Sequence, residues 1–253
     1  MEKDIIFLLV GLIVGAMNAI AGGGMLIGFP VLVALGISPL VANATGGVIT
    51  APGQFSSAIG YWRYLRKVPL RYTWLLIPVI VGAICGATTL RHTSAEHFAH
   101  IVPVLVLFGV ALFAFQPLMH FHLHKQLQGR YKTILPLVIL GIAIVPLSFY
   151  GGYFGAGYGF IMLAFLGFTN LPDTHTINAM KNVSAIFLST TTIICLLCTH
   201  LIDWRVGLIM GTGSTIGGFL GARGAQKVSG HWLRITIICI GLLAVVYLGF
   251  QEY

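Results

Sequence analysis

A single lysine lies inside one of the most apolar stretches of the chain. Lys181 is the sixth residue of the apolar run 176–201. An ionisable side chain within a transmembrane segment is costly, which makes it a candidate functional residue by default. Its ammonium could bind an anionic substrate, and burial disfavours the charged form, so the same group could also couple transport to protons. The alternative is that the side chain snorkels to the lipid headgroups, because it lies near the start of the run.

Amide and hydroxyl side chains accompany the lysine on the apolar runs. They could donate hydrogen bonds to the oxygen atoms of an anion, or they could hydrogen-bond neighbouring helices as such residues commonly do in membrane bundles. The candidates are Asn18, Asn43, Thr45, Asn178 and Asn182.

Glycines interrupt two of the apolar runs. Gly22, Gly23 and Gly24 follow the run 5–21, and Gly155 and Gly157 lie in the sequence GGYFGAGYG. Each glycine weakens a helix interior by about 1 kcal/mol, so these segments are predicted to break helices. A broken helix presents unpaired N–H groups and the positive end of its dipole. Glycine also lets an oxyanion approach the backbone closely. We therefore expect the five glycines to contribute to an anion-binding site.

The composition places these segments in a lipid bilayer. Of the 253 residues, 57% are hydrophobic and 8% are charged, and the mean hydropathy is +0.95. A soluble domain carries about 25% charged residues, so we expect an all-α integral membrane protein. The net charge of +8 does not indicate nucleic-acid binding, because the basic residues stand singly or in short clusters between apolar runs. Charges in such places set membrane topology.

The apolar runs occur in the same order twice along the chain. Asn43-Ala44-Thr45 aligns with Asn178-Ala179-Met180, and Gly82-xxx-Gly86 aligns with Gly217-xxx-Gly221. Interrupted segments at corresponding positions of two halves are typical of secondary transporters and indicate the binding site. We predict a first repeat at 1–119, a connector at 120–132 and a second repeat at 133–253. Each repeat consists of a glycine-broken helical pair followed by three transmembrane helices. The runs are 5–21, 25–37, 40–62, 72–90, 101–119, 133–150, 160–171, 176–201, 206–222 and 232–250.

The distribution of basic residues favours inverted repeats. If each broken pair enters and leaves on one side, ten of the 14 Lys and Arg residues lie on the side of the connector. The positive-inside rule then places the connector in the cytoplasm and both termini outside. The ten are Arg63, Arg66, Lys67, Arg71, Lys125, Arg130, Lys132, Arg223, Lys227 and Arg234, and the residues on the other side are Lys3, Arg91 and Arg205. The sequence leaves open whether each broken pair is re-entrant or crosses fully.

Two long signatures resemble a known transporter family. AGGGMLIGFPVLVALGISPLVANAT resembles the first-repeat signature of the TauE/SafE sulfite exporter family. GGYFGAGYGFIMLAFLG, INAMKNVSAI, LIDWRVGL and GGFLGARGA resemble its second-repeat signature. The resemblance covers residues 8–248 or so. It implies a transporter of sulfite or organosulfonate anions in the bacterial cytoplasmic (inner) membrane.

Other functional classes receive less support from the sequence. A passive anion channel would fit the broken repeats equally well, and Cys195 and Cys198 could form a membrane thiol-disulfide relay. No paired carboxylates and no nucleophile–base motif occur, so we do not expect an enzyme or a cofactor. We expect no metal site either, because His120, His122 and His124 fit a solvated connector better. Whether the chain forms a homodimer is left open.

Overall fold

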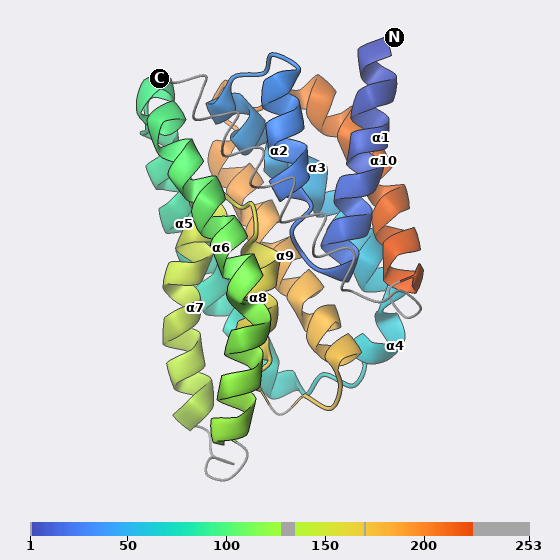
Figure 1. The fold of residues 1–253 in the computed structure, drawn as a ribbon, viewed down its shortest axis with the longest axis vertical. Helices are drawn as coiled ribbons and strands as arrows, with labels where there is room; N and C mark the ends of the chain where they lie inside the picture. Colours follow the sequence, from blue (N-terminus) through green and yellow to red (C-terminus); the bar gives the residue numbers. More distant parts are fainter. Residues whose placement is uncertain (1, 128–134, 170, 225–253) are drawn as a thin grey trace.

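The computed structural model describes residues 2–127, 135–169 and 171–224. Within these ranges, only the backbone is described for residues 112–127 and 135–136. Every element of regular secondary structure in these ranges is a helix (Figure 1). The run 232–250, predicted to be the last transmembrane helix, lies outside the described residues.

The first half of the chain begins with a helical hairpin. Helix α1 (Glu2–Ile20) leaves the end of the molecule where residue 2 lies, here called the N-terminal end, and α2 (Met25–Ala34) returns toward it (Figure 1). The next helix, α3 (Pro39–Gly60), starts after Ser38 with proline in its first turn, a position that suits proline because the missing N–H is not needed there. It leads to the opposite end, here called the α4 end. The remaining elements of this half are α4 (Trp62–Leu65), the 3-10 helix η1 (Leu70–Leu75), α5 (Leu76–Arg91) and α6 (Ala95–Leu127).

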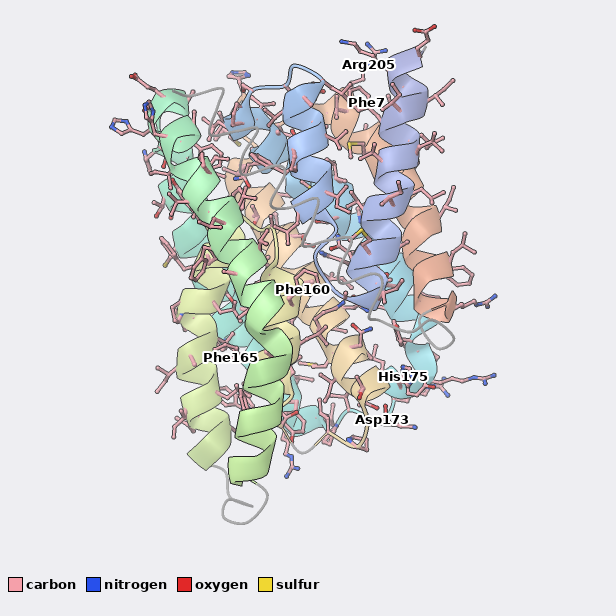
Figure 2. All side chains as sticks on the ribbon, viewed as in Figure 1. Phe7, Phe160, Phe165, Asp173, His175 and Arg205 are labelled. Atoms are coloured by element: carbon pink, nitrogen blue, oxygen red, sulfur yellow. The ribbon has the colours of Figure 1, made fainter. Side chains whose placement is uncertain are left out.

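The second half begins with a hairpin that enters from the α4 end. Helix α7 (Leu135–Tyr153) runs toward the middle of the molecule (Figure 1). Helix α8 (Tyr158–Leu166) returns, so that Phe160 lies near mid-height and Phe165 lies closer to Asp173 at the α4 end (Figure 2). Asp173 caps α9 (Thr174–Leu196) by accepting a hydrogen bond from the backbone N–H of Thr176 at 2.7 Å. The last described helix is α10 (Trp204–Gly224).

The helices have the length and composition of a membrane protein. In the described part of the chain, three helical segments are long and apolar enough to cross a bilayer: Glu2–Ile20, Leu70–Arg91 and Thr174–Leu196. Large apolar side chains such as Ile59, Ile139 and Ile194 are more than half exposed on the outside of the bundle. Extensive exposed apolar surface of this kind marks membrane contact. The prediction of an all-helical integral membrane protein agrees with this arrangement.

Helices from the two halves pack on each other through glycines. α1 lies against α10, and α5 lies against α7. A Cβ atom on Gly15 of α1 would overlap the backbone of Ser214 in α10, and one on Gly152 of α7 would lie 2.9 Å from the Cα atom of Ala83 in α5. Small residues at such interfaces let helix backbones approach closely in lipid. α3 and α9 cross between these two pairs and contact each other.

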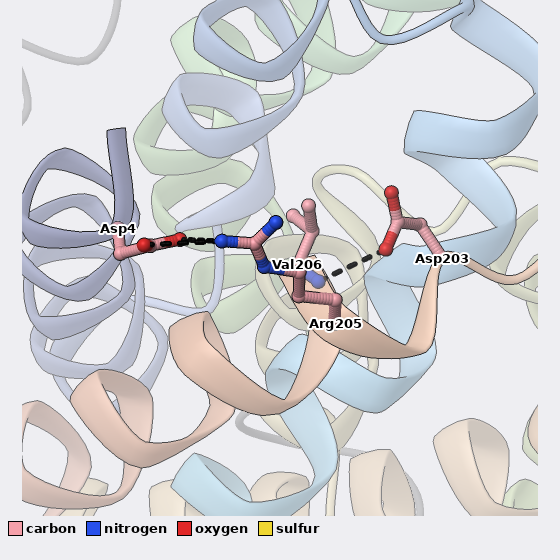
Figure 3. Close-up of polar contacts among 4 residues, drawn as sticks. All are labelled: Asp4, Asp203, Arg205 and Val206. Carbon is pink, nitrogen blue, oxygen red and sulfur yellow. Dashed lines mark hydrogen bonds and ion pairs between the residues drawn. The ribbon is translucent and has the colours of Figure 1, made fainter. Parts of the chain in front are cut away.

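Polar contacts fasten α10 to α1 at the N-terminal end. The guanidinium of Arg205 lies 3.1 Å from a carboxylate oxygen of Asp4, and the backbone N–H of Val206 donates to the Asp203 carboxylate at 3.0 Å (Figure 3). The Arg205–Asp4 pair joins the start of α10 to α1, and the Asp203 carboxylate caps the first turn of α10.

Part of the predicted connector 120–132 is helical. Helix α6 continues to Leu127, beyond the predicted end of its apolar run at residue 119. The backbone of residues 120–127 therefore extends α6, and residues 128–134 lie outside the described part.

Candidate functional site

The two glycine breaks meet inside the bundle. Gly22, after α1, adopts a φ of 96°, and Gly157, before α8, adopts a φ of 87°. Residues with a Cβ atom rarely adopt this left-handed conformation. A Cβ atom on Gly22 would lie 2.6 Å from the Cα atom of Gly159. The turn after α1 and the first turn of α8 are therefore in direct backbone contact.

A cavity lies beside this contact. Its empty volume is about 670 Å³ with its opening included. Both breaks and the crossing helices α3 and α9 contribute to its wall. Polar side chains and glycines share the lining with Met25, Leu90, Phe154 and Leu188. Of the eleven residues predicted to bind substrate, seven line it: Asn18, Gly22, Asn43, Gly155, Gly157, Lys181 and Asn182.

The lysine reaches into the protein. Only 1% of Lys181 is exposed, and its Nζ donates a hydrogen bond to the backbone oxygen of Asn18 at 2.6 Å. The side chain therefore does not snorkel. Asn18 lies in the last turn of α1, where backbone carbonyls lack helical partners, so the ammonium stabilises the end of the broken helix. An ammonium carries three donors, and Asn18 is its only hydrogen-bond acceptor among the described residues.

Asn18 also organises the first break through its side chain. Its Oδ1 accepts a hydrogen bond from the backbone N–H of Gly24 at 2.8 Å. Gly24 immediately precedes α2, so the asparagine supplies a partner to one of the unpaired N–H groups at this helix start. Asn18 thereby links Lys181 to the beginning of α2.

Asn182 is the least satisfied side chain of the cavity wall. It is 1% exposed, and neither its Oδ1 nor its Nδ2 has a hydrogen-bond partner among the described residues. A buried polar atom without a partner costs about 1–3 kcal/mol. Asn182 therefore has unused hydrogen-bonding capacity beside the cavity.

Asn43 lines the cavity from α3. Its Nδ2 donates to the backbone oxygen of Tyr153 at 2.8 Å. Tyr153 is the last residue of α7, so this amide supports the end of the second broken helix.

Four of the predicted residues do not line the cavity. A Cβ atom on Gly23 would overlap the ring of Phe160, and one on Gly24 would overlap the backbone of Val14. The hydroxyl of Thr45 accepts a hydrogen bond from the backbone N–H of Asp203 at 3.0 Å. These three residues hold the surrounding helices together.

Asn178 is the fourth of these residues. Its Nδ2 donates to the backbone oxygen of Ala19 at 2.9 Å and to the hydroxyl of Tyr61 at 3.0 Å. It therefore stabilises the end of α1 and is not part of the cavity lining.

Three polar side chains that the sequence did not predict, here called the polar trio, meet where α3 crosses α9: Thr50, Gln54 and Ser189. The Ser189 hydroxyl donates to Gln54 Oε1 at 3.0 Å, and it lies 3.3 Å from the Thr50 hydroxyl. All three residues line the cavity. The spacing Asn43, Gly47, Thr50, Gln54 follows one face of a helix, and this pattern could have identified the trio's α3 members.

The charge at the α4 end is arranged around Asp173. Burial alone would raise the pKa of this carboxyl, but hydrogen bonds from Thr176 and the Lys67 ammonium outweigh it and hold the pKa below its usual value. The Nζ of Lys67 lies 3.5 Å from the carboxylate. The ring of His175 packs against that of Tyr64 nearby, with ring centroids 4.9 Å apart and an angle of 38° between the ring planes.

The family of the chain follows from its full-length match to one sequence profile. The profile described as "Sulfite exporter TauE/SafE" matches residues 7–248. The chain belongs to this family. The cavity between the two broken helices is its candidate site.

Curated proteins similar to this TauE/SafE chain are named as transporters. A "Probable membrane transporter protein" of Haemophilus influenzae is 32% identical over 249 residues, covering 96% of this chain and 93% of that protein. "Probable membrane transporter protein YfcA" of Escherichia coli K12 is 29% identical over 252 residues, covering 96% of this chain and 88% of that protein. No solved structure matches the chain. The chain is therefore a membrane transporter by family.

The described cysteines stand apart from this site. Cys85, Cys195 and Cys198 carry free thiols, and none of them lines the cavity. The side chains of His120, His122 and His124 lie outside the described residues.

Proposed function

We propose that the chain is a secondary carrier that moves small sulfur oxyanions, sulfite or organosulfonates, across the membrane. The observation that carries this proposal is the buried ammonium of Lys181 in a cavity between two broken helices.

The charge balance of the cavity favours an anion. Among the described residues that line it, Lys181 is the only ionisable side chain apart from Tyr158. Low dielectric strengthens the attraction between its ammonium and an anion. An unpaired ammonium is costly to bury, so an anion beside it would offset that cost.

The backbone near the second break adds neutral donors. The start of α8, with Gly157 and Gly159 in the cavity wall, presents the positive end of a helix dipole and the N–H groups of these two glycines. The N–H groups of Tyr158 and Phe160 already donate to the backbone oxygens of Gly155 and Gly157. Together with the Asn182 amide, the two glycine N–H groups suit the several oxygen atoms of a sulfonate or sulfite.

Inverted repeats are part of the same proposal. The pairs α1–α10 and α7–α5 each join one half of the chain to the other. The aligned residues Asn43 and Asn178 each donate to the last turn of the broken helix in the opposite half, at Tyr153 and Ala19. Such a relationship supports alternating access by rocking of the repeats around a central site.

We further propose that the α4 end faces the cytoplasm of a bacterial inner membrane and that both termini lie outside. Basic side chains at the α4 end outnumber those at the N-terminal end in the described part, which agrees with the positive-inside rule. Single cysteines at Arg66 and His97, in a background without native cysteines, should react with an impermeant reagent from opposite sides of the membrane. Labelling of both from one side would contradict the inverted arrangement.

The carrier proposal is tested with the purified full chain. Calorimetry in detergent should detect binding of sulfite or simple alkanesulfonates and no binding of unrelated carboxylates of similar size. In proteoliposomes, a membrane potential or proton gradient should drive accumulation, and external substrate should accelerate exchange of internal substrate. Absence of binding to every sulfur oxyanion would refute the function, and flux without exchange acceleration would identify a channel.

A further inference from the structure

We infer that the anion bound in this cavity carries a neutral hydrogen-bond donor, such as a hydroxyl, beside its sulfonate group, and that Asn182 recognises that donor. The inference rests on the proposed function and narrows its substrate to hydroxylated short-chain organosulfonates.

The first step concerns the two ends of the Asn182 amide. Its Nδ2 is a donor and its Oδ1 is an acceptor, and both lack partners among the described residues. A fully deprotonated sulfonate oxygen can only accept hydrogen bonds. It would satisfy Nδ2 and leave Oδ1 buried without a partner. A ligand that satisfies the whole amide must therefore supply a donor as well.

The second step concerns the charge of that donor. An ammonium on the ligand would enter a cavity that already holds the ammonium of Lys181, and like charges disfavour each other at close range. The described residues of the cavity wall include no Asp or Glu that could compensate a second cation. A neutral hydroxyl meets the requirement of Oδ1 without this repulsion.

The third step concerns the rest of the ligand. Met25, Phe154 and Leu188 contribute apolar surface to the same cavity. A short carbon chain would bury its surface there, and removing apolar surface from water favours binding. The wall thus offers a cation, an amide with a free donor and acceptor, and an apolar surface, which together match a hydroxyalkanesulfonate.

The test compares three probes that differ in one group: 2-hydroxyethanesulfonate, ethanesulfonate and 2-aminoethanesulfonate. Titration calorimetry on the detergent-solubilised full chain should show the hydroxyl compound binding at least about tenfold more tightly than ethanesulfonate, because the latter leaves Oδ1 unpaired. The amino compound should bind more weakly than the hydroxyl compound.

Asn182→Leu should bring the ratio between the hydroxyl compound and ethanesulfonate close to one. Ser184→Ala is the matched control, because its hydroxyl is also buried on α9 but donates within the helix to the Met180 oxygen; it should keep the ratio. If Asn182→Leu does not fold, the ratio measured in the parent protein decides.

The outcomes separate this inference from the proposed function. Equal affinity of the parent for ethanesulfonate and 2-hydroxyethanesulfonate would overturn the inference and leave the carrier intact, and it would indicate that water satisfies Asn182. Tightest binding of the amino compound would also overturn it. Failure of all three sulfonates and of sulfite to bind would remove both proposals.

Discussion

The backbones of Gly22 and Gly159 lie directly against each other, with no side chain between them. A Cβ atom on Gly159 would lie 2.5 Å from the Cα atom of Gly22, a distance that real Cβ atoms do not tolerate. The turn after α1 and the first turn of α8 are therefore packed against each other without room for a side chain. A side chain at either glycine would push the two breaks apart.

Gly159→Ala is expected to destabilise the protein, although alanine favours a helix over glycine by about 1 kcal/mol. The overlap with Gly22 should outweigh that gain, because overpacking of a tight interior costs about 1–3 kcal/mol. The thermal unfolding midpoint in detergent measures the net effect. Gly224→Ala is the control, since a Cβ atom there meets no described residue within 4 Å. Equal midpoints for the two variants would contradict the close contact.

Much of the helical framework could be predicted from the sequence. Apolar runs of transmembrane length and glycine clusters are local signals. They correctly indicated that one helix ends shortly before Gly22 and that another begins at Tyr158. The same kind of signal identified Lys181 as a candidate functional residue. It left open whether the side chain faces inward, because an ionisable residue in an apolar run can find a partner inside the protein or reach water. The partner of Lys181, Asn18, could not be identified in this way.

The partners of the other polar residues depend on contacts between distant parts of the chain. Asn178 and Ala19 are 159 positions apart, and no local pattern in the sequence tells a helix-capping asparagine from a cavity-lining one. Asn182 is an asparagine on the same helix, but it lines the cavity and both of its amide atoms lack partners among the described residues. The three-dimensional arrangement of the helices determines that Asn182 lines the cavity and Asn178 does not.

Asn178→Leu should therefore lower stability and leave anion affinity close to that of the parent. The substitution removes the donor to the Ala19 oxygen and to the Tyr61 hydroxyl, and each buried group left without a partner costs about 1–3 kcal/mol. Thermal unfolding and calorimetric titration of the same preparation separate the two effects. A large loss of affinity with an unchanged unfolding midpoint would instead make Asn178 a substrate ligand.

Asp173 should make stability depend on pH at the α4 end. Its hydrogen bonds from Thr176 and the nearby Lys67 ammonium lower the pKa in the folded state despite the opposing effect of burial. The unfolded value lies near 4, so the contribution is fully present above that pH and is lost as the pH falls through the lower folded pKa.

Asp173→Asn keeps an acceptor for the Thr176 N–H but removes the titrating charge. The parent should lose more stability than this variant when the pH falls below about 4. Asp173→Ala removes the cap altogether and should cost about 1 kcal/mol at pH 7. Unfolding midpoints measured across the acidic range test both statements, and parallel pH profiles for the parent and Asp173→Asn would show that the carboxylate has no such role.

The strongest effect on function is expected from the charge of Lys181. Lys181→Met keeps a long side chain and removes the ammonium, so an anion in the cavity would lose its only cationic partner among the described lining residues. Truncating one member of a buried charge pair costs about 2–5 kcal/mol, which corresponds to a loss of affinity of roughly 30-fold or more. Lys181→Arg should be intermediate, because the charge persists with a different shape. Lys3→Met is the control, since it removes the same charge from an exposed position at the N-terminal end. Calorimetric titration with ethanesulfonate measures all three variants, and parent-like affinity in Lys181→Met would mean that backbone and amide donors hold the anion while the lysine only supports the end of α1.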